Sequence, residues 1–438
     1  MLGNASLFGV LQHPAYRRLF AAQVVSLLGT GLASVALGLL VFELGGADAG
    51  VILGTVLAIK IIAYVTIAPV AEALLGNLPR RTVLVSLDLV RAGFALALPW
   101  VTEIWQIYLL IFLLQAASAG FTPLFQATIP DLLKDEEDYT KALSLSRLAY
   151  DLETLLSPVL ATLLLAVVTW QGLYAGTVCG FLASAALVCT VSLPFSTKTQ
   201  LPFWKRVTRG MQIYLATPRL QGGLILHGVV AVAGAMVFVN TVVLVQGHFG
   251  LTEQDTALTL AAFGVGSMLV ALASPKLLEK FSERTVMLLG SLILVISLGI
   301  STGIEEWREL LPVWTMLGSG YSMIHIPMGR LLRRSAHTED RPALFAAHFS
   351  LSHACWLIAY PTVGWLGATL ELSLTFGILA VGCLLGCVLA WRVWPKIDPI
   401  DLEHRHDDLS SDHPHLSGTQ VHVHPYVIDD LHPQWPGR

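Results

Sequence analysis

Charged side chains are scarce in this chain. Aspartate, glutamate, lysine and arginine together make up 13% of its 438 residues, which is about half the share usual in soluble domains. Hydrophobic residues make up 55%. This composition excludes an ordinary water-soluble protein and predicts an integral membrane protein, since so much apolar surface needs a lipid environment.

Motifs for covalent or nucleotide chemistry are also missing. No glycine-rich phosphate loop ending in Gly-Lys-Ser or Gly-Lys-Thr occurs, and no nucleophile stands out with its base. We therefore expect no enzyme activity, no cofactor and no nucleic-acid partner, and an ion gradient, protons by default, as the energy source. The few cysteines all lie in apolar runs, where they act as packing residues: Cys179, Cys189, Cys355, Cys383 and Cys387.

Twelve apolar runs are long enough to cross a hydrocarbon core of about 30 Å as helices. We therefore expect an all-α integral membrane fold with twelve transmembrane helices. His13, Arg17 and Arg18 precede the first run without a small-residue cleavage site, which indicates a retained first helix rather than a signal peptide. The protein is then a multi-pass protein of the inner (plasma) membrane. The runs lie near 20–43, 50–74, 82–102, 105–129, 140–167, 170–194, 220–247, 255–278, 285–304, 310–332, 342–367 and 370–394.

Basic residues of the connectors fall almost entirely on one side of the predicted membrane. Among them only Arg308 falls on the other side, so the positive-inside rule predicts that both termini are cytoplasmic. The longest connector, 195–219, is basic and amphipathic, and it separates two six-helix bundles at 1–194 and 220–395. We expect the protein to be a monomer that contacts membrane lipid.

The two halves share a short repeat. The segment Leu74–Leu84 aligns without a gap with Leu277–Met287, and each copy lies in the connector between the second and third helix of its half. Two equivalent six-helix bundles can rock about one central cavity, as in transporters built from parallel repeats. The alternative is a chance similarity between two short basic connectors.

The sequence resembles the major facilitator superfamily, and in particular its drug and metal efflux branch. The segment Phe20–Gly29 is similar to the first helix of that branch, and Arg80 and Arg81 followed by Asp88–Ala92 resemble the superfamily's loop motif. The resemblance covers residues 10–395. It implies the major facilitator fold and transport by alternating access between the two bundles.

The loop motif is only half kept. Glu72 and Gly76 stand where the motif has its glycine and its aspartate, so the resemblance does not carry over the salt-bridge latch of that loop. Of the paired basic residues Arg80 and Arg81, the second-half copy keeps one, as Arg284. The fifth-helix Gly-Pro element of antiporters survives only as Ser157-Pro158.

Four charged residues at membrane depth are spaced for pairing. An ionisable side chain near the bilayer centre costs at least a few kcal/mol, so each needs a partner or a function. Arg147 and Asp151 are four residues apart on one predicted helix, and Asp88 and Arg91 are three apart on another, which are contact spacings. They are either structural ion pairs or part of the coupling machinery.

Glu153 is the acid that we expect to be functional. It lies about 200° around the predicted helix from Asp151, so the two carboxylates cannot share a face. Lys60 of another helix is a candidate partner. A carboxylate at this depth without a partner on its own helix is suited to binding a proton or a cation.

Histidines form a second group in the membrane part. His348 and His353 are five residues apart, about 140° around a helix, so they cannot chelate one ion along one face. A metal site would have to combine helices, for instance His325 with His353, with His227 or Asn240 nearby. Neutral imidazole binds divalent transition metals and can also relay protons. The alternative for each ring is an interhelical hydrogen bond.

The C-terminal tail, 396–438, is polar, acidic and rich in histidine. This composition predicts disorder. Three His-X-His pairs recur in it, and alternate residues of an extended chain point the same way, so each pair can offer two imidazoles to one ion. The alternative is a solubilising tail that carries histidines. The predicted metal-ligating residues are His404, His406, His413, His415, His422, His424 and His432.

A facilitator-type core with a His-rich tail resembles the nickel and cobalt resistance exporters of the superfamily. Our leading hypothesis is therefore export of a divalent transition metal, nickel or cobalt, by proton antiport through Glu153 and the membrane histidines. One alternative is proton-coupled efflux of an organic solute such as a drug, macrolide or siderophore. Another is a membrane-anchored metal sensor or buffer.

Overall fold

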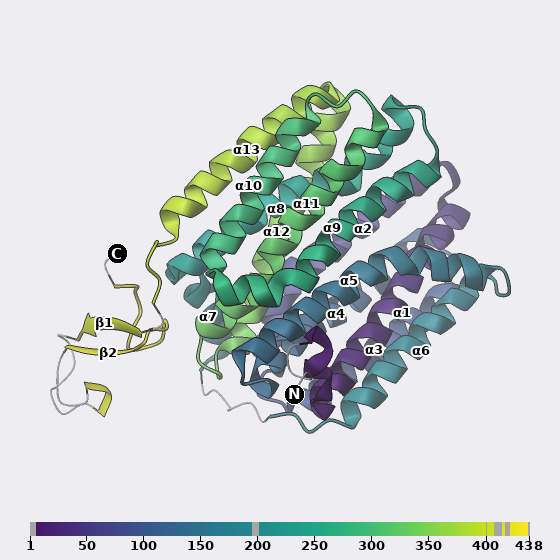
Figure 1. The fold of residues 1–438 in the computed structure, drawn as a ribbon. Helices are drawn as coiled ribbons and strands as arrows, with labels where there is room; N and C mark the ends of the chain where they lie inside the picture. The colour runs from purple at the N-terminus through teal and green to yellow at the C-terminus, as the bar shows by residue number, and fades with distance from the viewer. Residues whose placement is uncertain (1–5, 195–200, 400, 407–413, 417–420, 437–438) are drawn as a thin grey trace.

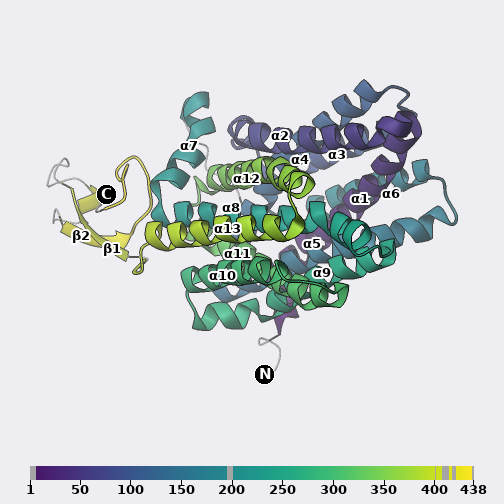
Figure 2. The ribbon, with the colours of Figure 1, turned by 90° about the horizontal axis from the view of Figure 1, so that it is seen from above.

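The computed structural model describes residues 6–194, 201–399, 401–406, 414–416 and 421–436. Within these residues, two groups of six long helices lie side by side (Figures 1 and 2). The first half comprises α1 (Pro14–Gly45), α2 (Ala49–Leu75), α3 (Arg80–Ala97), α4 (Ile104–Leu132), α5 (Glu136–Leu165) and α6 (Trp170–Cys189). The second comprises α8 (Pro218–Val242), α9 (Glu253–Lys280), α10 (Glu283–Ser301), α11 (Trp307–Arg334), α12 (Arg341–Thr369) and α13 (Leu372–Val393).

Short elements join or precede these helices. They are η1 (Leu7–Gln12), η2 (Gly46–Asp48), η3 (Leu98–Trp100), the π-helical η4 (Val243–His248), α7 (Phe203–Ala216) and, in the tail, η5 (Pro414–Leu416). The repeated segment falls at the junction of α2 with α3 and at that of α9 with α10, as the sequence predicts.

Each of the twelve predicted runs coincides with one long helix. Eleven of the described helices are long and apolar enough to cross a membrane, and α11 is the one that falls short. Its middle carries polar and small residues together with His325. Because α11 packs mainly against α9 and α10, its polar side chains face protein rather than lipid, where their cost is lower.

Glycines let helices of one half approach closely. A Cβ added at Gly180 of α6 would lie 2.7 Å from the Val25 carbonyl oxygen of α1. In the second half a Cβ at Gly318 of α11 would lie 1.8 Å from the Phe263 carbonyl oxygen of α9. Small residues at such positions give the close backbone packing typical of membrane helices.

The two halves meet mainly along α5 with α9 and α2 with α12, and also where α4 contacts α12 and α5 contacts α11. The amphipathic α7 lies across this junction, where it packs on α12 and α2. Its Gly210 is essential to that contact, since a Cβ there would lie 1.9 Å from the Ala343 carbonyl oxygen. The described part of the connector, 201–219, thus contains a docked helix.

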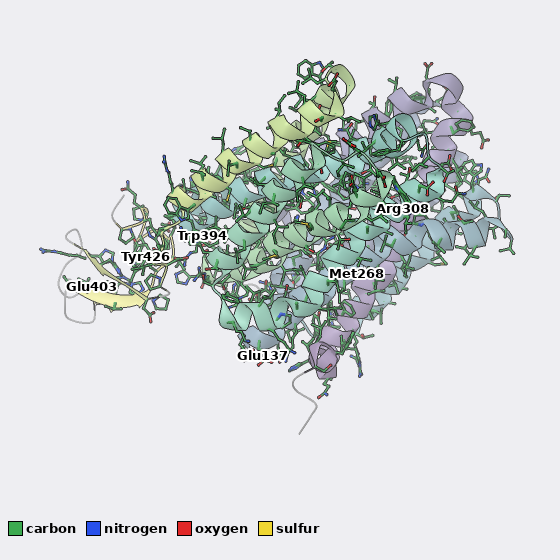
Figure 3. The ribbon with its side chains drawn as sticks, turned by 45° about the horizontal axis from the view of Figure 1, so that its top comes forward. Glu137, Met268, Arg308, Trp394, Glu403 and Tyr426 are labelled. Carbon is green, nitrogen blue, oxygen red and sulfur yellow. The ribbon has the colours of Figure 1, made fainter. Side chains whose placement is uncertain are left out.

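Both termini lie at the same end of the bundle, which we call the terminal face (Figure 1). In Figure 3, Trp394 and Tyr426 lie at this end and Arg308 lies far from it. The described residues of the tail include two antiparallel strands, β1 (Asp401–Arg405) and β2 (Val421–Pro425).

The tail is held to the second half by its apolar residues and by Arg219. Tyr426 and Ile428 are buried in the core of that half. The Arg219 guanidinium donates to Asp398 at 3.0 Å and to the Tyr426 carbonyl oxygen at 3.4 Å, and it lies over the Trp435 ring. These contacts hold the described residues after β2 against the second half.

Candidate functional site

A cavity of about 470 Å³ lies between the two halves. Its volume is within the range of small-molecule sites in proteins. The first half contributes most of the wall, through α1 to α5, and includes Lys60, Arg91, Arg147 and Glu153. The second half contributes residues of α11 and α12: His325, Ile326, His348, Phe349, Ser352 and His353.

Four imidazoles gather at the second-half wall of this cavity. His325, His348 and His353 line it. His227 of α8 lies behind them, with its ring centroid 4.9 Å from that of His325 and 4.8 Å from that of His348. His227, His325 and His348, from three helices, therefore lie together. His353, the predicted partner of His325, lies on the same wall beside Tyr64 and Phe349.

Backbone carbonyls fix the tautomer of two of these rings. His227 Nδ1 lies 2.9 Å from the Gly223 oxygen, and His353 Nδ1 lies 2.7 Å from the Phe349 oxygen. A carbonyl oxygen can only accept, so each Nδ1 carries the proton and each Nε2 of the neutral ring keeps its lone pair. His227 Nε2 and His325 Nε2 are buried without a hydrogen-bond partner. A neutral imidazole nitrogen without a partner can ligate a metal ion.

Asn240 lies apart from these histidines. Its amide nitrogen donates to the Val363 carbonyl oxygen at 3.3 Å and lies 3.2 Å from Met236 Sδ. It does not line the cavity. Its predicted place beside His325 and His353 is therefore wrong, because the hydrogen bond to α12 turns it into a helix-packing contact.

Arg147 and Asp151 form the ion pair that their spacing predicts, and this pair joins the halves. Ser267 of α9 donates to Asp151 at 2.6 Å, and Arg147 Nε lies 3.1 Å from the same hydroxyl. Arg147 also lies over the ring of Tyr321 in α11, 4.9 Å from its centroid. The serine could not be identified from the sequence, because it comes from the other half of the chain.

Asp88 and Arg91 also form an ion pair, but it stays within the first half. Ser184 of α6 donates to Asp88 at 2.7 Å. Arg91 lies between the rings of Phe121 and Phe181, 4.0 and 4.4 Å from their centroids. Because every charge here has a close partner, the pair fits a structural function, although Arg91 also reaches the cavity wall.

Glu153 lines the cavity and takes part in no ion pair among the described residues. Lys60, across the cavity on α2, acts on it electrostatically, as the sequence suggests. Gly31 makes room for it, since a Cβ at that position would lie 3.2 Å from Glu153 Oε1. The carboxylate is thus exposed to the cavity without a fixed counter-ion.

Ion pairs join the two halves at the terminal face. Asp131, at the end of α4, pairs with Arg80 at 2.5 Å and also with Arg341 of α12. Glu136 of α5 pairs with Arg330 of α11. This network supplies the latch that the altered loop motif lacks. The sequence motif gave no signal for Asp131, because that acid lies on another helix.

The other basic residues of the motif have different surroundings. Arg284 donates to the main-chain oxygens of Trp391 and Trp394, at 2.9 and 3.1 Å. It therefore fastens α10 to the end of α13 and does not bridge the halves. Arg81 is exposed.

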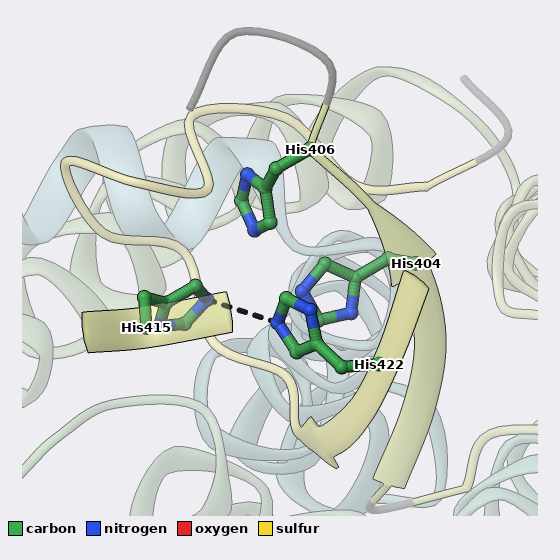
Figure 4. A group of neighbouring side chains, drawn as sticks. All are labelled: His404, His406, His415 and His422. Atoms are coloured by element: carbon green, nitrogen blue, oxygen red, sulfur yellow. Dashed lines mark hydrogen bonds between the residues drawn. The ribbon is translucent and has the colours of Figure 1, made fainter. Parts of the chain in front are cut away.

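The tail brings six of its histidines together. The strand register places His404 opposite His422, and His424 lies on the same face of the hairpin. Figure 4 shows four of the rings turned toward a common centre. Ligand nitrogens of two overlapping groups lie within 4.8 Å of one another: His404, His406, His415 and His422, and His404, His415, His424 and His432. His413 lies outside the described residues.

Asp429 supports the ring of His432. The carboxylate accepts from His432 Nδ1 at 2.8 Å and lies 3.4 Å from His337 Nε2 in the connector between α11 and α12. Burial lowers the pKa of His432 to about 4, so this ring is neutral at physiological pH. The hydrogen bond with Asp429 raises the pKa of His337. A carboxylate behind an imidazole is the usual outer support of a metal-ligating histidine.

The sequence pattern of the Major Facilitator Superfamily matches residues 19–238 and 223–408. An uncharacterised MFS-type transporter of Bacillus subtilis, YfiS, is 23% identical over 84% of this chain and 89% of its own length. The macrolide efflux protein A of Streptococcus pyogenes is 24% identical over 87% of this chain and 95% of its own length.

Two solved structures share the fold. The human organic anion transporter MFSD10 superposes with a TM-score of 0.69 at 12% identity, over 86% of this chain and 98% of its own. A bacterial homologue of the iron transporter ferroportin, in an outward-facing state, gives a TM-score of 0.71 at 14% identity, over 86% and 99%. Since the family pattern covers both halves, the chain belongs to the Major Facilitator Superfamily of membrane transporters.

Proposed function

We propose that this transporter exports a divalent transition metal, nickel or cobalt first, from the cytoplasm in exchange for protons. The observation that carries the proposal is the group of four imidazoles at the cavity wall, His227, His325, His348 and His353. Neutral imidazole is a good ligand for nickel, cobalt, zinc and copper. Two of these rings already present an Nε2 lone pair.

The ion would bind as the halves move. In the present arrangement ion pairs join the halves at the terminal face, and the compact ligand groups among the described residues lie in the tail. The cavity imidazoles belong to the second half, whereas Glu153 belongs to the first. Alternating access changes the distance between the halves, so a site shared by both halves tightens in one state and loosens in the other.

Glu153 is suited to carry the exchanged proton. Its carboxylate faces the cavity without a fixed counter-ion, and Lys60 is the cation that acts on it. A metal ion that enters the cavity favours the charged carboxylate, and a proton that enters favours its neutral form. Competition between the two at one cavity couples export of the metal to entry of protons.

The test compares metal flux in two variants. Everted membrane vesicles with His325→Ala/His348→Ala should lose Ni²⁺ and Co²⁺ accumulation, because the variant removes half of the imidazole group. The matched control, His248→Ala, changes an exposed histidine outside the cavity and should keep full flux. Undiminished Ni²⁺ and Co²⁺ accumulation in the double variant would contradict the proposal.

Efflux of an organic solute is the second candidate. It is favoured by the similarity to a macrolide efflux protein and by the aromatic residues of the cavity wall, which are Tyr64, Phe121, Phe125, Tyr150 and Phe349. The same vesicles, loaded with a fluorescent macrolide or dye, separate the two functions. Organic efflux predicts dye transport that survives loss of the cavity imidazoles, together with no movement of Ni²⁺.

A further inference from the structure

The six described tail histidines turn the same ring nitrogen toward one point. His432 Nε2 lies 3.0 Å from His404 Nε2 and 3.2 Å from His406 Nε2. His415 Nε2 lies 3.1 Å from His422 Nε2 and 3.3 Å from His424 Nε2. All six rings therefore converge through Nε2, although they come from β1, η5, β2 and the segment after β2.

Several of these nitrogens carry lone pairs that face each other. His404 Nδ1 lies 3.0 Å from the Leu402 carbonyl oxygen, and His432 Nδ1 lies 2.8 Å from the Asp429 carboxylate. Both Nδ1 atoms must donate, so both Nε2 atoms of the neutral rings are acceptors. Two acceptors 3.0 Å apart repel unless a cation lies between them. One extra proton can relieve a single pair, whereas a metal ion can satisfy all six rings.

The rings are arranged as the corners of an octahedron. An octahedron gives each corner one opposite corner, and His404 with His415 is such a pair, with ring centroids 6.3 Å apart. Neighbouring rings have centroids 4.5 to 5.3 Å apart. The other ring pairs among the six are in contact, apart from His406 with His424 and His422 with His432. These two are therefore the other opposite pairs.

The distances between nitrogens agree with one central ion. Metal–imidazole bonds are about 2.1 Å long, which gives neighbouring nitrogens a separation of about 3.0 Å in an octahedron and about 3.4 Å in a tetrahedron. The four Nε2 separations are 3.0 to 3.3 Å. They lie at or above the octahedral value and below the tetrahedral one.

We propose that these six imidazoles form a single octahedral site for one divalent transition-metal ion. Six nitrogen donors in an octahedral field favour Ni²⁺ and Co²⁺ through their d electrons, whereas Zn²⁺ has no such preference and usually takes four ligands. This proposal does not depend on which solute the membrane bundles carry. Delivery of the bound ion from the tail to the cavity would rest on the proposed function. The six ligands are His404, His406, His415, His422, His424 and His432.

Asp429 and Asp430 connect this site to the membrane part. Asp429 reaches both His432 and His337, and Asp430 pairs with Arg209 of α7 at 2.8 Å. Arg209 also pairs with Asp340, next to the latch residue Arg341, at 3.0 Å. An ion in the tail therefore stabilises the docked position of the hairpin at the terminal face.

The experiment is a Co²⁺ titration of the purified full-length protein, followed by visible absorption. The unaltered protein should bind one more Co²⁺ per chain than His404→Ala/His432→Ala does. This additional ion should show the weak absorption bands of six-coordinate cobalt. Ni²⁺ should displace this ion at a lower concentration than Zn²⁺ does. The His248→Ala control should bind as the unaltered protein does.

Three results would overturn the proposal: the intense bands of four-coordinate Co²⁺, tighter binding of Zn²⁺ than of Ni²⁺, or unchanged cobalt binding in the double variant. A second variant, His415→Ala, changes a residue outside the strands and so tests the site without altering the hairpin. It should also lose the ion.

The cavity variant His325→Ala/His348→Ala should keep the tail ion. Ion binding by the tail therefore tests the octahedral site, and transport by the cavity variant tests the proposed function, so that either can fail without the other.

Discussion

Asp131 of the first half and Arg341 of the second form an ion pair that joins the bundles at the terminal face. The Asp131 side chain is 3% exposed, and it also accepts from Arg80 at 2.5 Å. Both arginines thus depend on one buried carboxylate. Because a buried ion pair that loses one partner leaves an uncompensated charge, opening this face requires that water or a new partner reach Asp131.

Asp131→Asn should weaken closure of the terminal face. Removing one partner of a buried pair costs about 3–5 kcal/mol, and here the cost falls on the closed state. A thiol placed in the cavity by Ser352→Cys should then react several-fold faster with a reagent added from the terminal face. Arg81→Ala is the control, because that side chain is exposed and its loss should leave the rate unchanged. An unchanged rate in Asp131→Asn would show that other contacts close this face.

Asp151→Asn should alter the movement of the halves, whereas Asp88→Asn should not. Both changes break a buried ion pair and should lower the melting temperature. Only Asp151 also accepts from Ser267 of the other half, at 2.6 Å, so only its loss should change the cavity labelling rate. Equal labelling in the two variants would contradict an inter-half function for this pair.

Glu153→Gln should abolish proton-coupled transport while the protein stays inserted. The amide keeps the size of the side chain but cannot exchange a proton, so metal flux should no longer respond to an imposed pH gradient. Glu43→Gln, an exposed acid at the end of α1, is the control. A Glu153→Gln protein with full gradient-driven flux would remove Glu153 from the coupling mechanism.

Asp429→Asn should weaken metal binding by the tail about 10–100-fold, since outer-shell carboxylates orient the ligating imidazole. Amide hydrogen exchange over residues 421–436 should become faster, because the link to His337 is weakened as well. Asp430→Asn is the matched control: its side chain is 80% exposed, and a surface ion pair contributes only about 0–1 kcal/mol. Equal metal affinity in Asp429→Asn and the unaltered protein would exclude this support.

The helices could be predicted from the sequence because membrane-spanning segments need about 20 apolar residues in a row. The ion pairs Arg147–Asp151 and Asp88–Arg91 could be predicted for a similar reason, since helical spacing fixes which side chains meet. Both inferences use only local order along the chain, and the structure confirms both pairs.

Contacts between distant segments could not be predicted. Nothing near Arg80 in the sequence indicates Asp131, and Asn240 turns to α12 instead of the histidines. The tail shows the same limit. Alternation predicts that His404 and His406 can share an ion, but only the strand pairing brings His422 to His404, and only the fold of the segment after β2 brings in His432. The local sequence pattern thus predicts which residue types can act as ligands, whereas the number of ligands that meet depends on the tertiary structure.

The most direct test of the central claim is simultaneous measurement of Ni²⁺ and proton flux in proteoliposomes that contain the purified protein. An imposed pH gradient should drive Ni²⁺ transport against its own gradient, with protons moving in the opposite direction, and an ionophore that collapses the pH gradient should stop both fluxes. Sealed proteoliposomes that transport a macrolide or dye but neither Ni²⁺ nor Co²⁺ would contradict the assignment of the cavity imidazoles to metal export.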